Sequence, residues 1–181
     1  MTESIMVVTV RRATVEDAAG IASSHVRSWQ EGYRHVIPGD FLDGLNSNLA
    51  DRTARWQAQI LGATAQGRFV LVGEVDGEIA GWLTGGKCRD EAADDQHVGE
   101  VHGCYVDPAN WRRGVGSALM AEALELLAIA GYVYAILWVL DDNPRARAFY
   151  ERHGWVCDGG RQMFTIAEVS VPEVRYRRSL G

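Results

Sequence analysis

Residues 101–119 read VHGCYVDPANWRRGVGSAL, and this stretch decides the fold. Its first six residues are typical of a strand, which an Asp-Pro turn signal ends. Gly114 and Gly116 then open a helix with apolar periodicity. Because glycine has no side chain, backbone N–H groups at the positive helix end can approach an anion, and Arg112 and Arg113 add charge. The stretch therefore predicts a strand, a turn and a helix start that favours a phosphorylated ligand.

The same residues exclude two common phosphate-binding loops. No Gly-Lys-Ser or Gly-Lys-Thr follows at the spacing of a Walker loop, and the glycines form a single GxG pair instead of GxGxxG. Nucleotide hydrolysis and dinucleotide binding are therefore disfavoured. On this stretch alone, a helix start with closely packed glycines and solvated arginines is the alternative.

A second motif, NPRARAFYERHGW at residues 143–155, follows one predicted strand later. Residues 111–116, WRRGVG, resemble motif A of the GCN5-related N-acetyltransferase (GNAT) superfamily, which is Gln/Arg-x-x-Gly-x-Gly/Ala after a strand. Residues 143–155 resemble its motif B, Asn-x-x-Ala-x-x-Phe-Tyr-x-x-x-Gly-Phe. The resemblance covers nearly the whole chain and is strongest over residues 68–157. Trp111 is a departure, because the family often has Gln or Arg there.

The resemblance implies a fold and an activity. The implied fold is mixed α/β, with a largely antiparallel central sheet that is split by a bulge and covered by helices on both faces. The implied activity is direct transfer of an acetyl group from acetyl-CoA to a primary amine. A transferase for another acyl group and a non-catalytic acyl-CoA sensor are alternatives, and the presence of Tyr150 and Glu100 disfavours the sensor.

The family pattern also implies a cofactor site. The loop and helix start would bind the pyrophosphate of acetyl-CoA through backbone N–H groups, and the preceding strand end would pair with the pantetheine arm. Gly103 is the residue best suited to the bulge. Asn143 resembles a cofactor-binding residue, although Asn before Pro is also a common helix cap. The implied cofactor residues are Cys104, Tyr105, Val106, Arg112, Arg113, Gly114, Val115, Gly116, Ser117 and Asn143.

Two residues are candidates for proton transfer. Glu100 stands where several family members have the base that deprotonates the attacking amine, which is mostly protonated at neutral pH. A solvent-facing charge or a pair with an arginine is the alternative for Glu100, and His102 or water could replace it as base. Tyr150 matches the family tyrosine that protonates the departing thiolate, and the alternative is packing on the apolar side of its helix.

The acceptor side is predicted less specifically. Family resemblance places Trp29 and Tyr33 on it, with His35 and Trp82 nearby, and core packing is the alternative for each aromatic residue. Residues 89–96 are almost wholly charged or small, which predicts an exposed acidic loop. That loop either attracts a cationic amine or only aids solubility.

The remaining patterns predict the other elements. Strands are expected at residues 7–10, 69–75, 78–83, 97–106, 132–140, 155–157, 163–166 and 174–176. Helices are expected at residues 15–32, 114–130 and 142–153, with one or two more within 41–61. Asp76-Gly77 predicts a tight hairpin, and Thr14 with Asp17 predicts a capping box.

Composition limits the functional classes. The 181 residues fit a single domain spanning 1–181, and the net charge of −6 argues against a nucleic-acid partner. Three widely spaced cysteines suggest neither disulfides nor a metal site and fit a reducing cytoplasm. We expect no membrane span, signal peptide or metal. The expected partner is an amine-bearing small molecule or peptide, and its identity and a homodimer are left open.

Overall fold

The computed structural model describes residues 7–90, 97–166 and 168–181. Its seven-stranded sheet has the order β1-β2-β3-β4-β5-β7-β6. Among the described strands, β4 and β5 pair in parallel and the other neighbours are antiparallel. The strands are β1 (Val8–Arg12), β2 (Arg68–Val75), β3 (Glu78–Lys87), β4 (Val98–Val106), β5 (Tyr134–Leu140), β6 (Val156–Ile166) and β7 (Val169–Ser179).

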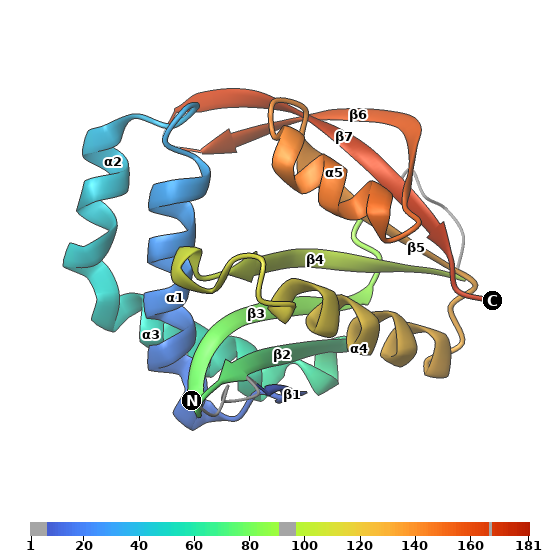
Figure 1. Cartoon of the computed structure of the whole chain (residues 1–181), viewed down its shortest axis with the longest axis horizontal. Coiled ribbons are helices and arrows are strands. Elements are labelled where there is room, and N and C mark those ends of the chain that lie inside the picture. Colours follow the sequence, from blue (N-terminus) through green and yellow to red (C-terminus); the bar gives the residue numbers. More distant parts are fainter. Residues whose placement is uncertain (1–6, 91–96, 167) are drawn as a thin grey trace, which may run out of the picture.

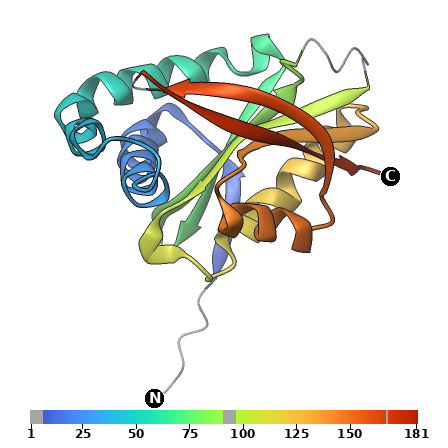
Figure 2. The same ribbon diagram turned by 90° about the horizontal axis from the view of Figure 1, so that it is seen from above.

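Helices cover both faces of the sheet, as Figure 2 shows. They are α1 (Ala18–Gly32), α2 (Gly39–Asp43), α3 (Leu49–Gly62), α4 (Val115–Ile129) and α5 (Pro144–Arg152). One apolar cluster joins α4 to the sheet through fully buried residues such as Leu119 and Leu83. A second cluster joins α1 and α3 to the opposite face through Ile21, Trp56 and Trp82. The mixed α/β fold predicted from the sequence is confirmed.

Short sequence motifs correctly predicted a turn and a helix cap. Asp76 and Gly77 both have positive φ, 53° and 81°, as the tight turn between β2 and β3 requires. The carboxylate of Asp17 accepts a hydrogen bond from the Thr14 backbone N–H at 2.7 Å, which completes the predicted cap. The helical stretch at 41–61 divides into α2 and α3.

The prediction of separate strands at 155–157 and 163–166 was wrong. Apart from Trp155, which precedes it, both lie in the single long strand β6, which pairs with β7 from Val156 to Ile166. The register shifts between Cys157 and Arg161, and Gly159 has a φ of 87°. An irregularity of this kind lets a strand continue through glycines that resemble a turn in the sequence.

A wedge opens in the middle of the sheet, between β4 and β5 (Figure 1). The two strands pair only from Val98 to Val101 on β4. At the same level the β3–β4 register shifts, because Thr84 pairs with Gly103 while Gly85 pairs with Val101. The extra residue is His102, next to the glycine that the sequence indicated for the bulge.

Helix length and polarity bear on membrane insertion. Within the described ranges, no helix has both the length and the apolar character that crossing a membrane requires.

Candidate active site

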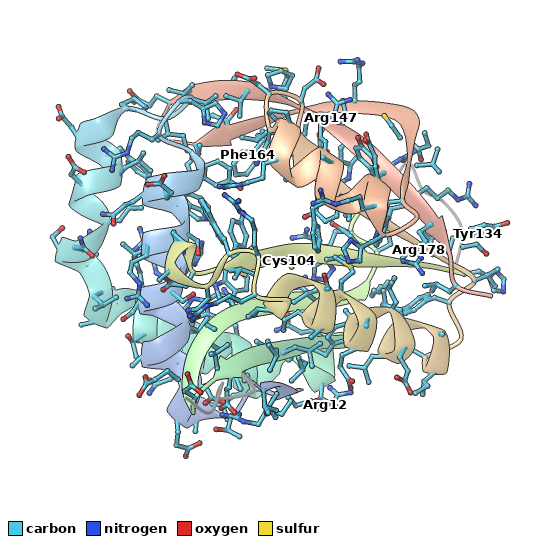
Figure 3. The ribbon with its side chains drawn as sticks, in the orientation of Figure 1. Arg12, Cys104, Tyr134, Arg147, Phe164 and Arg178 are labelled. Atoms are coloured by element: carbon cyan, nitrogen blue, oxygen red, sulfur yellow. The ribbon has the colours of Figure 1, made fainter. Side chains whose placement is uncertain are left out.

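A cavity of about 1350 Å³ occupies the wedge and extends on both sides of the end of β4. One half is lined by the start of α4 and by α5, and the other by α1, β3 and the β6–β7 hairpin. Cys104 and Phe164, both labelled in Figure 3, belong to its lining. The volume exceeds the roughly 300–1,000 Å³ of typical small-molecule pockets, so the cavity can hold two ligands side by side.

The first half contains an anion site at the start of α4. Arg112 and Gly114 have positive φ, 62° and 85°, and this alternation turns successive N–H groups toward one point. Arg113 Nη1 donates to Asn110 Oδ1 at 3.0 Å, which holds the loop in place. The N–H groups of Val115, Gly116 and Ser117 belong to the first helical turn and have no acceptor inside the helix. These groups can bind a phosphate, and phosphate binding here stays a prediction.

Trp111 contributes to this half in a way that the sequence did not indicate. Its indole Nε1–H donates to the Val106 carbonyl at 2.8 Å, and the guanidinium of Arg145 lies 3.4 Å above its ring. The Ser28 hydroxyl donates to the same carbonyl at 3.2 Å. Because strand backbone groups alternate in direction, the Val106 N–H and the Cys104 carbonyl also face away from β3. The Cys104 N–H faces the same way as its carbonyl, and these backbone groups can pair with an extended ligand.

Tyr150 lies on α5, where it borders both the cavity and the apolar core. Its side chain is 8% exposed, and its pKa is raised well above the usual value by burial first and then by Cys104 and Tyr105. The phenol therefore stays protonated at neutral pH. The two interpretations offered by the sequence, packing residue and proton donor, are compatible in this geometry.

Asn143 caps α5, and its Oδ1 accepts a hydrogen bond from the Ala146 N–H at 3.1 Å. It also lines the cavity, so its amide N–H groups can reach a ligand. Farther along, His153 Nε2 lies 2.9 Å from Ser117 Oγ and ties the end of α5 to the start of α4. His153 and its neighbour Arg152 both line the cavity and were missed in the sequence, where they stand at unassigned motif positions.

Aromatic residues form the wall of the second half. Trp29 of α1 and Tyr33, which caps the C-terminal end of α1, line the cavity, and their role in acceptor binding stays a prediction. The Tyr33 hydroxyl lies 2.8 Å from the Tyr105 hydroxyl of β4. Trp82 also borders the cavity but is 4% exposed and stacked against Tyr105. His35 is exposed and hydrogen bonds to the Asp142 carbonyl instead, outside the residues that line the cavity.

Glu100 is paired with an arginine, one of the alternatives that the sequence left open. Its Oε1 accepts from Arg89 Nη2 at 2.6 Å, its Oε2 accepts from the Arg89 backbone N–H at 2.7 Å, and it is 2% exposed. His102 Nε2 lies 3.8 Å from Oε2. Burial, and then the charge of Arg89, lower the pKa of His102 to about 4, although Glu100 acts in the opposite direction.

The prediction of an exposed acidic loop holds for Arg89, which is exposed, and was wrong for Asp90, which is partly buried. Arg89 binds Glu100, and Asp90 Oδ2 lies 2.8 Å from Arg175 Nη1 on β7. Both residues therefore belong to the wall of the second half. Glu91, Asp94 and Asp95, the other acidic residues of that loop, lie outside the described residues.

The cysteines are all free thiols, and Cys104 borders the cavity. Burial raises the pKa of the Cys104 thiol to about 12, so it is protonated at neutral pH and a poor nucleophile. Among the described residues, no group of His, Cys, Asp and Glu side chains is arranged to hold a metal ion.

Comparison with known proteins assigns this architecture. The model of the acetyltransferase (GNAT) family matches residues 27–155. The chain belongs to this family. An uncharacterized N-acetyltransferase of Bacillus subtilis (strain 168), YuaI, is 34% identical over 146 residues, which cover 81% of this chain and 79% of the relative. This GNAT protein is therefore an N-acetyltransferase, and acetyl-CoA is the acetyl donor of the family.

Solved structures agree with the fold. The PaiA N-acetyltransferase of Thermoplasma acidophilum, solved with coenzyme A, has a TM-score of 0.72 at 16% identity and covers 93% of this chain and 98% of its own. YncA of Salmonella typhimurium, solved with acetyl-CoA, has a TM-score of 0.70 at 19% identity and covers 98% of this chain and 95% of its own. At these identities the likeness is one of fold.

Proposed function

We propose that this GNAT acetyltransferase transfers an acetyl group from acetyl-CoA directly to a primary amine within one ternary complex. The observation that carries this proposal is the continuous cavity, which joins an anion-binding helix start to an aromatic acceptor half, with Tyr150 at its border. We treat residues 1–181 as one catalytic domain that acts in the cytoplasm, where free cysteines stay reduced.

The donor half would bind acetyl-CoA in two ways. The pyrophosphate would accept hydrogen bonds from the first-turn N–H groups of α4, with positive charge from nearby arginines. The pantetheine arm would pair with the backbone of Cys104 and Val106, and Asn143 would donate from its free amide. The proposed donor-binding residues are Cys104, Tyr105, Val106, Arg112, Arg113, Gly114, Val115, Gly116, Ser117 and Asn143.

Tyr150 would complete the departure of the thiol. Cleavage of the C–S bond leaves a thiolate, and a protonated phenol near it can donate the proton that the thiolate needs. The raised pKa of Tyr150, caused mainly by burial, supports this role because the donor keeps its proton until the thiolate forms.

A carboxylate of the acceptor half would accept the proton that the amine loses. Glu100 is the base suggested by the family pattern, but both its oxygens already accept hydrogen bonds from Arg89. It can take the proton only if Arg89 moves away. His102 is a weak base, because its pKa is about 4. A carboxylate that is not engaged by arginine suits the task better.

Replacing Cys104 with alanine tests direct transfer against transfer through a covalent cysteine. We expect kcat to change by less than about threefold, because a thiol with a pKa of about 12 supplies little thiolate at neutral pH. Mass spectrometry of protein incubated with acetyl-CoA alone should find no acetylated cysteine. Acetylation at Cys104, together with loss of activity in the alanine variant, would establish a two-step mechanism instead.

Thiol release from acetyl-CoA tests the proposed function itself. Purified protein is mixed with acetyl-CoA and single primary amines, including 2-phenylethylamine, spermidine, lysine and a short peptide with a free N-terminus. Release that depends on one of the amines, with the matching N-acetyl product found by mass spectrometry, supports the transferase. Binding of CoA without amine-dependent release from any member would contradict it for these acceptor classes.

A further inference from the structure

Most charged side chains in the acceptor half are already paired with one another. Arg89 binds Glu100 at 2.6 Å. Arg175 binds both Asp90 and Asp158, at 2.8 and 2.9 Å. Asp90 and Glu100 line the cavity and Asp158 does not, so a cationic ligand in the cavity would have to displace an arginine to bind Asp90 or Glu100.

Glu173 on β7 differs from these carboxylates because its hydrogen-bond partner is an uncharged side chain. Its Oε2 accepts a hydrogen bond from Gln162 Nε2 at 2.7 Å. In the described ranges of the chain, no cationic side chain lies within ion-pairing distance of it. Glu173 lines the cavity and is partly buried, so Gln162 orients the carboxylate while Oε1 stays available to a ligand.

Three apolar side chains share a face of the sheet with this carboxylate, and Arg175, two residues along β7, shares it too. On the sheet, Gln162 of β6 and Leu140 of β5 stand directly opposite Glu173, so the three side chains share one face. Trp138 and Phe164, each two residues along its own strand, lie on that face too. Apart from Arg175, these residues line the cavity. A ligand bound at Glu173 would therefore place its uncharged part against Leu140, Trp138 and Phe164.

Glu173 and Tyr150 both act electrostatically on Tyr33. Burial raises the pKa of Tyr33 most, and the charges of Tyr105, Tyr150 and Glu173 raise it further. Tyr33 is thus within electrostatic reach of both Tyr150 and Glu173. Its hydroxyl is hydrogen bonded to that of Tyr105, and Tyr33, Tyr105, Tyr150 and Glu173 all line the cavity. The carboxylate and the proposed proton donor therefore belong to one site.

The charge environment of Glu173 suits a proton acceptor. Burial is the largest cause that raises its pKa, and Glu100 on β4 acts in the same direction, while Gln162 and Arg89 lower it. The other titratable groups that face it are Tyr33 at the C-terminal cap of α1 and Tyr105 on β4. A carboxylate with a raised pKa holds a proton better at neutral pH than an ordinary one.

On the N-acetyltransferase function proposed above, we propose that Glu173 binds the ammonium group of the acceptor and accepts its proton. The acceptor class is a primary ammonium attached to an apolar body. One proton passes from the ammonium to Oε1, and the freed lone pair forms the C–N bond with the acetyl carbonyl carbon. The C–S bond breaks, the thiolate takes the proton of Tyr150, and the remaining excess proton on nitrogen restores that phenol. Glu173 then releases its proton to water.

Amine binding to the CoA complex tests the first step without requiring turnover. Saturation-transfer NMR with 2-phenylethylamine compares the wild type with Glu173→Gln, which keeps shape and hydrogen bonding but removes the charge. We expect dissociation constants at least about tenfold higher in the variant, as for loss of one partner of a buried charge pair. Glu125→Gln, an exposed charge change on α4 outside the cavity lining, should bind like the wild type.

Turnover tests the second step. With an amine that the wild type acetylates, we expect kcat/KM of Glu173→Gln to fall about 100-fold at pH 7, the contribution of a general base. The loss should shrink as the pH approaches the amine pKa of about 10, because the amine then binds without its extra proton.

Failure of this inference and failure of the proposed function give different results. Equal amine affinity in the wild type and Glu173→Gln, or no binding of 2-phenylethylamine to the wild type, overturns the role of Glu173 even if thiol release occurs. Retained kcat/KM in Glu173→Gln with a loss in Glu100→Gln overturns it too and assigns the proton to Glu100. Charge-dependent binding without thiol release from any amine supports the binding site and contradicts the transferase.

Discussion

Replacing Tyr150 with phenylalanine is expected to lower kcat about 100-fold, the lower end of what a positioned acid contributes. The phenol is largely buried and within electrostatic reach of Cys104 and Tyr105, so no water molecule easily takes over as donor. Affinity for CoA should stay within about twofold, because the proposed phosphate and pantetheine contacts come from α4 and β4. Amine-dependent thiol release and calorimetry with CoA measure the two quantities.

Tyr134→Phe is the matched control for this change. Tyr134, labelled in Figure 3, carries the same hydroxyl on β5 but does not line the cavity. The guanidinium of Arg177 lies over its ring. Tyr134→Phe should keep wild-type kcat and CoA affinity. If Tyr150→Phe turns over at the wild-type rate, the thiolate takes its proton from another source. If it loses CoA affinity along with kcat, Tyr150 holds the cofactor or the fold.

Features that depend on local sequence were predictable. The loop before α4 was found because positive φ at residue 114 and bare N–H groups require glycine nearby. The β2–β3 hairpin was found from Asp76-Gly77, and the start of the first helix from Thr14 and Asp17. In each case the residues that determine the geometry are within a few positions of one another, so a short stretch of sequence is enough to predict it.

The acceptor half was less predictable because its contacts join distant parts of the chain. Arg175 meets Asp90 across 85 positions, and Tyr33 meets Tyr105 across 72. The position of Glu173 depends on the full length of β6, which the glycines at 159 and 160 concealed by resembling a turn. With β6 recognised as one strand, alternation would have placed Gln162 and Phe164 on a common face.

Trp111 shows a different limit. The family pattern made it a departure with no assigned contribution, because the side chain expected there was Gln or Arg. In the structure its indole N–H donates a hydrogen bond to the Val106 carbonyl, and its ring lies under the guanidinium of Arg145. Both contacts depend on the path of the loop between β4 and α4, including positive φ at Arg112, a residue type that rarely adopts it.

A carboxylate introduced at position 116 is expected to separate phosphate binding from helix stability. Gly116 is the second residue of α4, and a Cβ added to it would meet Phe149 and Val106 at ordinary contact distances of 3.4 and 3.5 Å. Gly116→Asp therefore fits sterically. Its negative charge at the positive helix end should stabilise the isolated helix start by about 0.3–1 kcal/mol, so we expect an unchanged or slightly higher Tm.

The same carboxylate should weaken CoA binding about 100-fold or more. At about 4 Å, two like charges near a protein surface repel by roughly 4 kcal/mol, and the carboxylate would also compete for the N–H groups of the first turn. Gly116→Asn is the neutral isosteric control and should lose about tenfold or less. Calorimetry with CoA at low and high salt measures the difference, which should shrink as salt screens the repulsion.

Two results would contradict the placement of the pyrophosphate at the start of α4. Equal losses in Gly116→Asp and Gly116→Asn, with no salt dependence, would mean that bulk at position 116 blocks the pantetheine path beside Phe149 and Val106. Wild-type affinity in Gly116→Asp would mean that the phosphates bind elsewhere, for example beside Arg152 and His153 at the end of α5, which line the same cavity. A charge-specific loss with an intact Tm is explained only by an anion at this helix start, because a folding defect would lower the Tm and a steric one would appear equally with asparagine.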